Sequence, residues 1–483
     1  MHVPVTFTLP SFLGGMLLTF SVAFATEHDT LELTLEKALE YAHDNSPEIE
    51  LVRQNFFYAQ ETYDAFLKDY LPQVILTSNV PGLNRSIKSV QQPDGSIAYR
   101  AQSQTYGTAA IQVRQRVSLT GGTFTASSGI ERFDNLNTNN YYWRSTPFVL
   151  SYQQPIFQPN TMKWNRELEK IQFELSKRAY EEQLNSLNIR IVNAFFNVYI
   201  NQINLEITKI NYTVNDTVFN LSKHRFDVGK IAENDLLQSE LELMKAESSL
   251  EAAQYELNRS LRELLILIGM PVDAEVKVIA PTHAPTLEID QDLFLERAME
   301  LSPDVLRNRL STVNAELSLK QAQTNQRFNA ELSMGFGYNQ SGENLLDLYK
   351  DPFDQEHFTM SLEIPLFTGG KNKAQVNARK SALKAAEIQE ALTRQKIQEE
   401  IIDMLRQFEQ LKKQIDIAVQ SDTIAQRRFE VTKNRYLIGK VDITSLFMAQ
   451  QEQDLARRTY IQTLKNYWMS YYQILGILNS GNW

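Results

Sequence analysis

The side chains that could carry out chemistry are too dispersed to form a catalytic or metal site. Six histidines are scattered along the chain, and no pair has the spacing that puts two metal ligands on one helix face. They are His2, His28, His43, His224, His283 and His357. The chain has no cysteine, which excludes a thiolate metal site, a disulfide scaffold and a cysteine nucleophile. We therefore expect no enzyme, no metal and no other cofactor.

Two Gly-Lys pairs, Gly229-Lys230 and Gly439-Lys440, stand out among the short motifs. Neither is a phosphate-binding loop, because no Ser or Thr follows the lysine and the upstream glycine is missing. Each pair lies between two segments with helical character, so we interpret it as a helix–turn–helix tip whose glycine supplies a left-handed residue. That structural role can be the only one. Alternatively, the exposed backbone beside the lysine accepts the helical hairpin of a partner protein.

Two long segments without Gly or Pro, 161–228 and 371–438, lead into these tips. At 1.5 Å per residue, each would form a helix about 100 Å long. Apolar residues recur every seven positions, which predicts a coiled-coil seam. The first seam comprises Leu184, Ile191, Val198, Leu205, Tyr212, Phe219 and Phe226, and the second includes Ile401, Phe408, Ile415, Phe429 and Tyr436. The helices after the tips carry rows of small residues that favour close packing: Ser239, Ala246, Ala253 and Ser260, then Ala449, Ala456, Thr463 and Ser470.

Matching segments in the same order indicate that the chain is a tandem repeat. Leu35–Leu51 is similar to Gln291–Arg307, Ser151–Phe157 to Ser361–Phe367, and Arg225–Leu237 to Arg435–Phe447. The first offset is 256 residues and the other two are 210, so the first repeat is longer by 46 residues between Leu51 and Ser151. The predicted organisation is a signal peptide (1–25), repeat 1 (26–270), a linker (271–288) and repeat 2 (289–483). Repeat 1 comprises a helix, strands at about 71–157, a long helix at 160–227, a turn and a helix at 231–269; repeat 2 comprises a helix, strands at about 329–366, a long helix at 370–437, a turn and a helix at 441–478.

The strands of each repeat have the alternating pattern of a sheet with one apolar face. The clearest is 109–119, followed by a Gly121-Gly122 turn and an extended segment at 123–130. Repeat 2 offers strands at 330–338 and 357–365, whereas 84–100 and 134–140 read as polar loops. Each strand set is too small to close its own core, so we expect several subunits to contribute strands to one structure. A soluble head is the alternative.

Composition and targeting signals narrow the class of protein. The net charge of −10 argues against a nucleic-acid binder, and no 18-residue apolar run follows the N-terminal segment, which excludes a polytopic helical membrane protein. The first segment, 9–25, is mostly apolar and ends in Ala23-Phe24-Ala25, a small-x-small cleavage pattern. We expect cleavage after Ala25; a short membrane anchor is the alternative.

The sequence resembles the TolC family of outer-membrane efflux and secretion channels, also called outer membrane factors. The resemblance rests on Ser46-Pro47 and Ser302-Pro303, on the junctions 154–157 and 364–370, and on the repeated Arg-aromatic-x-[Val/Ile]-Gly-Lys turn. It implies a mixed, mainly α fold: long coiled-coil helices form a periplasmic α-barrel, and antiparallel strands form a transmembrane β-barrel shared by a homotrimer. It also implies a place in the outer membrane of a Gram-negative bacterium, with a long periplasmic extension.

The family's barrel takes four strands from each protomer, and the 46 additional residues with the Gly121-Gly122 turn look like an added hairpin. This hairpin either joins the barrel wall, giving six strands per protomer, or packs outside it.

The resemblance implies a gate at the periplasmic tip. Asp235 matches an acidic position after the first turn, and Tyr436 matches a tyrosine that helps to latch the closed tip. The second turn departs from the family, because Val441 replaces the latch arginine and Ser445 and Met448 replace a double ring of aspartates. Asp442 and Glu233 can supply acidity from shifted positions. Alternatively, Asp235 and Asp442 only favour helix N-termini.

The implied function is a passive exit duct for a tripartite efflux pump or a type I secretion system. Its partners would be outer-membrane lipid, a periplasmic adaptor that meets the tips at Gly229, Lys230, Gly439 and Lys440, and through the adaptor an inner-membrane transporter. The alternative is a periplasmic or surface coiled-coil scaffold or adhesin without a pore. The cargo (drug, metal, siderophore or protein) stays open.

Overall fold

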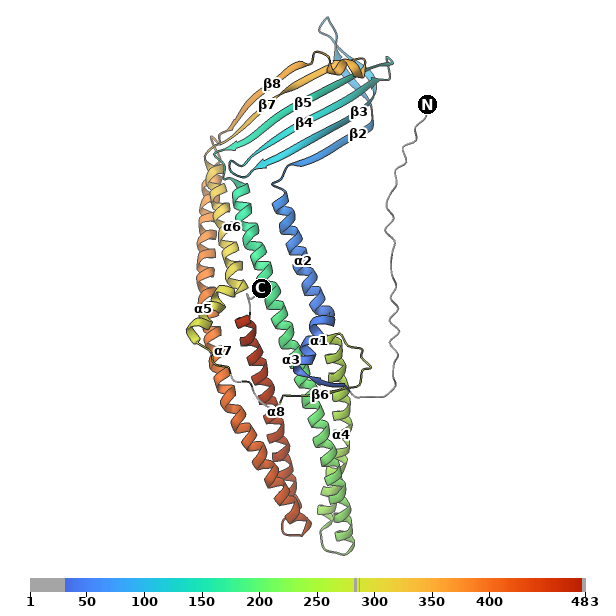
Figure 1. Ribbon diagram of the computed structural model, residues 1–483, viewed down its shortest axis with the longest axis vertical. Coiled ribbons are helices and arrows are strands. Elements are labelled where there is room, and N and C mark those ends of the chain that lie inside the picture. The colour runs from blue at the N-terminus through green and yellow to red at the C-terminus, as the bar shows by residue number, and fades with distance from the viewer. Residues whose placement is uncertain (1–30, 282–284, 286, 480–483) are drawn as a thin grey trace.

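A computed structural model describes residues 31–281, 285 and 287–479. The expected signal peptide, 1–25, lies outside these residues. The molecule is mainly helical and elongated, with one antiparallel sheet at one end and two helical hairpins reaching away from it (Figure 1). The two hairpin tips lie at the end of the molecule farthest from the sheet.

Four long helices form the two hairpins. Helices α3 (Thr161–Asp227) and α7 (Lys371–Leu437) have 67 residues each, and α4 (Glu233–Ile268) and α8 (Ile443–Asn479) return from the tips. Seam residues such as Ile191, Val198 and Phe408 are buried. Others, such as Phe226, remain exposed in the single protomer, so the seam is only partly covered within one chain.

The helices that precede the strands are each broken by a Ser-Pro pair. Helix α1 (Leu35–Asn45) is followed by α2 (Pro47–Lys68), and α5 (Gln291–Leu301) by α6 (Pro303–Gln326). The residue before proline is disfavoured in helical geometry, whereas proline itself is well suited to a first helical turn. The Ser46 hydroxyl donates a hydrogen bond of 2.8 Å to the carbonyl oxygen of Leu267, which ties this break to the end of α4.

A short parallel pair lies beside the helices. Strand β1 (Leu31–Thr34) pairs with β6 (Val276–Ile279), which belongs to the segment expected to be a linker. The same region contains the largest buried cluster, in which Phe195 and Phe196 of α3 pack among residues of α1, α4 and α8.

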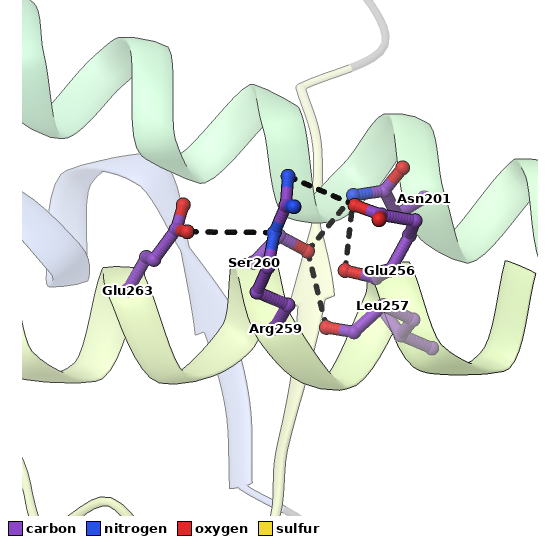
Figure 2. A network of polar contacts seen from close by, with 6 residues as sticks. All are labelled: Asn201, Glu256, Leu257, Arg259, Ser260 and Glu263. Carbon is purple, nitrogen blue, oxygen red and sulfur yellow. Dashed lines mark hydrogen bonds and ion pairs between the residues drawn. The ribbon is translucent and has the colours of Figure 1, made fainter. Parts of the chain in front are cut away.

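Close packing of α3 against α4 depends on the row of small residues. Ser239, Ala246 and Ser260 are buried. Asn201 of α3 donates to the hydroxyl oxygen of Ser260 at 2.9 Å, and that hydroxyl donates in turn to the carbonyl oxygen of Leu257 at 3.1 Å (Figure 2). A larger side chain at Ser260 would fill the space through which these two backbones approach.

Six strands form one antiparallel sheet in the order β2–β3–β4–β5–β7–β8. They are β2 (Gln73–Gln91), β3 (Ile97–Val117), β4 (Gly122–Asn135), β5 (Asn140–Ile156), β7 (Asn329–Gly342) and β8 (Phe353–Glu363). The expectation of a loop over 84–100 is wrong, because β2 and β3 stay paired from Asn84↔Gln104 to Gln91↔Ile97. The polar residues there are strand residues whose backbone groups pair across the hairpin.

The hairpin of β3 and β4 is an integral part of this sheet and does not pack outside it. It lies between β2 and β5. Its inner turn, which follows Val117 and precedes Gly122, lies at the helical end of the sheet and is bound to the helices. Asn160 accepts the backbone N–H of Lys163 at 3.1 Å as the N-cap of α3, and its amide donates to the carbonyl oxygen of Ser118 at 2.7 Å. Arg116 of β3 forms a 2.7 Å ion pair with Asp69 at the end of α2. The described part of the chain therefore forms one six-stranded sheet that includes this hairpin.

Candidate functional site

The sheet has one apolar and one polar face. Pairing in register brings Phe124, Tyr152, Met334 and Phe358 into one row across four strands, with Leu332 and Met360 in the next row. Phe358 is 70% exposed although it is apolar. The opposite face carries polar residues or glycine in the row Gln73, Arg114, Thr125, Ser151, Gly335 and His357. A sheet that exposes an apolar band on one side and polar groups on the other separates lipid from water.

The two hairpin tips have the same backbone geometry. Gly229 and Gly439 have φ angles of +70° and +72°, so each adopts the left-handed conformation that ends a helix. The N–H of Lys230 donates to the carbonyl oxygen of Arg225 at 2.8 Å, and that of Lys440 donates to Arg435 at 2.9 Å. A Cβ atom added to either glycine would have no neighbour within 4 Å. Both turns therefore present open backbone beside a lysine at the end of the molecule.

The tips differ in how the following helix begins. Helix α8 is preceded by Asp442, whose carboxylate accepts the backbone N–H of Ser445 at 2.6 Å. This hydrogen bond holds the pKa of Asp442 below its usual range. The equivalent residue before α4 is Ala232, which has no side-chain cap. In this protomer the carboxylate of Asp442 is thus engaged as a helix cap.

Arg225 connects the first tip to the second. Its guanidinium lies over the ring of Tyr436, 5.5 Å from the centroid, and donates to the carbonyl oxygen of Leu437 at 3.5 Å. Tyr436 is only 5% exposed and belongs to a cluster with Val218, Phe429 and other residues of both hairpins. Sequence reasoning does not single out Arg225 as a gate residue, although it is the arginine of the turn motif at 225–230. Its contact is tertiary, and the motif alone does not show which aromatic ring the arginine meets.

The remaining predicted tip residues lie apart from this contact. Asp235 is half-buried in the first turn of α4, and no hydrogen bond joins it to Tyr436 within residues 31–281 and 287–479. Glu233 and Met448 are exposed, and Val441 packs against the cluster around Tyr436. A link between Asp235 and Tyr436 stays a prediction that one protomer does not realise.

A polar cavity of about 230 Å³ lies above the tips, where α3, α4 and α8 meet. Asn211 donates to the carboxylate of Asp454 at 2.7 Å, and burial raises the pKa of Asp454. The amide oxygens of Asn215 and Gln450 are buried without a hydrogen-bond partner. Leaving buried acceptors unpaired costs free energy, so the two hairpins are joined here less firmly than in the apolar clusters.

The described residues lack two kinds of feature. Across the part of the chain that the structure describes, no three His, Cys, Asp or Glu side chains gather in a group able to hold a metal ion. None of its helices is both long and apolar enough to cross a membrane.

Comparison with known proteins identifies the family. The outer membrane efflux protein family matches residues 38–270 and 294–480. The chain is 24% identical over 233 residues to the alkaline protease secretion protein AprF of Pseudomonas aeruginosa, and the match spans 47% of each chain, about half the length of that relative.

Solved structures share the fold. The CmeC outer membrane channel of Campylobacter jejuni has a TM-score of 0.64 at 16% identity, covering 92% of this chain and 86% of its own. The outer membrane protein VceC of Vibrio cholerae has a TM-score of 0.65 at 16% identity, covering 92% and 96%. The predicted outer-membrane location and the resemblance to TolC-like channels are confirmed. The chain belongs to the outer membrane efflux protein family.

Proposed function

We propose that three copies of this chain form a passive exit duct across the outer membrane and the periplasm. The observation that carries the proposal is the sheet with one apolar face joined directly to four helices, α2, α3, α6 and α7. A sheet spans a membrane only when closed, because every backbone group must be paired in the absence of water. The exposed edges of β2 and β8 and the exposed seam residues require other copies of the chain.

The duplicated organisation supports this assembly. Helices α3 and α7 begin at Thr161 and Lys371 and end at Asp227 and Leu437, and both pairs are 210 residues apart. We propose that repeat 1 (26–270) and repeat 2 (289–483) descend from one unit. Each repeat then supplies one hairpin to the wall of a tube, and three protomers supply six.

We propose that the tips form the gate and the site of the adaptor. Open backbone at Gly229 and Gly439 beside Lys230 and Lys440 suits a partner's helical hairpin. Asp235 and the Arg225–Tyr436 contact are the groups we assign to closure of the tip. An inner-membrane transporter would act through the adaptor.

The cargo depends on the transporter. AprF is named for the secretion of alkaline protease, which favours a type I secretion role for this chain, whereas structures such as CmeC are described only as outer membrane channels. A role in a tripartite efflux pump is the second candidate, favoured by the membership of the chain in the outer membrane efflux protein family.

The test is reconstitution of the full chain into planar lipid bilayers. We expect discrete single-channel currents from a trimeric species, together with membrane fractionation and heat-modifiable migration on gels. A fully soluble protein that forms no trimeric pore would refute the duct and favour the coiled-coil scaffold.

A further inference from the structure

The two repeats contribute unequally to the sheet. The segment before α3 has four strands, and the segment before α7 has two. The additional pair is the β3–β4 hairpin, in the region where repeat 1 is longer by 46 residues. Its inner turn continues into no helix and is held by Asn160, Gln154 and Arg116. Its contacts make it a fixed part of the sheet.

The two outer strands can complete each other between copies of the chain. Strand β2 leads away from the helices and β8 returns to them, so the two edges run in opposite directions. In the described residues neither outer edge has a strand neighbour. An antiparallel pair of β2 from one copy with β8 from the next would continue the pattern of the whole sheet.

The strand register of the sheet gives an offset between neighbouring strands that matches the offset in closed barrels. Directly opposed residues lead from Gln73 through Arg114, Thr125, Ser151 and Gly335 to His357, five strand steps away. Strand β8 then runs from 357 to 363, six residues farther toward the helices, where β2 begins. Six residues over five steps is a stagger of about 4 Å for each strand spacing of about 4.8 Å, which corresponds to a strand tilt of about 40°. Closed barrels have tilts of about 35–45°.

We infer that the wall of the assembled trimer contains eighteen strands, with β2 of each protomer paired to β8 of its neighbour. The inference rests on the proposed trimeric duct and adds the width of its barrel. At this tilt, eighteen strands give a backbone diameter of about 36 Å, whereas twelve would give about 24 Å. A lumen of this width admits polypeptide segments already folded into helices, which are about 10–12 Å across. The β3–β4 hairpin is the element that sets this width.

Cysteine cross-linking in the full chain tests the pairing, because the chain has no cysteine of its own. Thr77→Cys is combined with His357→Cys, Thr359→Cys or Ser361→Cys, which share the polar face of β8. Within one protomer these positions are separated by five strand spacings, about 24 Å across the sheet, and by four or more residues along it, far beyond the reach of a disulfide. We expect at least one pair to give covalent dimers and trimers on non-reducing gels. The control, Thr77→Cys with Ser333→Cys on the inner strand β7, should give none.

Cryo-electron microscopy of the full-length trimer in nanodiscs counts the strands directly. We expect eighteen, and twelve in a variant lacking residues 97–139, whose wall should be narrower by about one third. A conducting trimer in which no cysteine pair cross-links and the wall has twelve strands would overturn this inference and leave the duct intact. If no trimer formed, both the proposed duct and the eighteen-stranded wall would be wrong. If the deletion variant does not fold, the cysteine pairs and the strand count of the unmodified chain still decide the question.

Discussion

Replacing Arg225 with alanine should loosen the closed tip of the channel. Arg225 is the side chain of the first turn that reaches the second, through the ring of Tyr436 and the carbonyl oxygen of Leu437. Alanine removes both interactions and leaves the left-handed turn at Gly229 intact. Tyr436 keeps its apolar contacts within the cluster. The change therefore weakens the connection between hairpins more than either hairpin.

The size of the effect follows from the two interactions. A cation–π contact at a partly exposed site contributes about 0.5–1 kcal/mol. The hydrogen bond is long, at 3.5 Å, and we assign it the low end of the net range, about 0.5 kcal/mol. For each protomer, the total of about 1–1.5 kcal/mol corresponds to a weakening of the closed contact by about five- to twelvefold, and the proposed trimer contains three such contacts.

The assay is single-channel recording of the reconstituted trimer, with open probability as the readout. The second turn supplies a matched control, because Arg435 occupies the same position there but is exposed. Arg435→Ala removes the same charge without a contact between hairpins and should change open probability little. Equal effects of the two variants would mean that net charge at the tip, and not the Arg225 contact, controls opening. If Arg225→Ala did not change the open probability, the Arg225–Tyr436 contact would have no role in closing the tip.

Three further predictions concern the tip, the helix packing and the polar cavity. Asp235→Ala should raise resting conductance in bilayers; unchanged conductance would remove Asp235 from the gate. Ser260→Leu should lower helical stability by about 1–3 kcal/mol, since it overfills the α3–α4 contact, whereas exposed Ser248→Leu should be nearly neutral when thermal unfolding is followed by circular dichroism. Burial raises the pKa of Asp454, so its charged form opposes folding. The free energy of unfolding should therefore increase as the pH falls through the raised pKa and the carboxylate takes up a proton. Asp454→Asn should therefore raise the midpoint temperature of unfolding at pH 7 and reduce the further rise of that temperature at lower pH. An unaltered pH profile would contradict this reasoning.

Local patterns in the sequence were sufficient to predict much of the helical part. Glycine at 229 and 439, the seven-residue spacing and the absence of Pro in the rods are local signals, and local geometry determines long helices and their ends. Strand alternation likewise indicated β3 around 109–119. The upper part of β2 was missed because Asn84, Arg85 and Ser86 have no apolar face, and their strand geometry depends on pairing with β3.

Long-range contacts account for the other omissions. The contact between Arg225 and Tyr436 joins residues from different hairpins, and only the packing of the hairpins shows which arginine of the two is used. The four-residue strands β1 and β6 are too short for periodicity to reveal them. The sequence leaves open whether the β3–β4 hairpin belongs to the sheet, because strand order is a property of the whole sheet.

The length of α3 and α7 turns small rotations into large displacements. Each helix has 67 residues and is about 100 Å long, so it acts as a lever between the sheet and the tip. A pivot of about 5° at the sheet end would move the tip by about 9 Å, close to the width of a helix. The sheet can therefore remain almost still while the two tips move by about the width of a helix. A gate of the kind proposed at the tips therefore depends on α3 and α7 being stiff along their length.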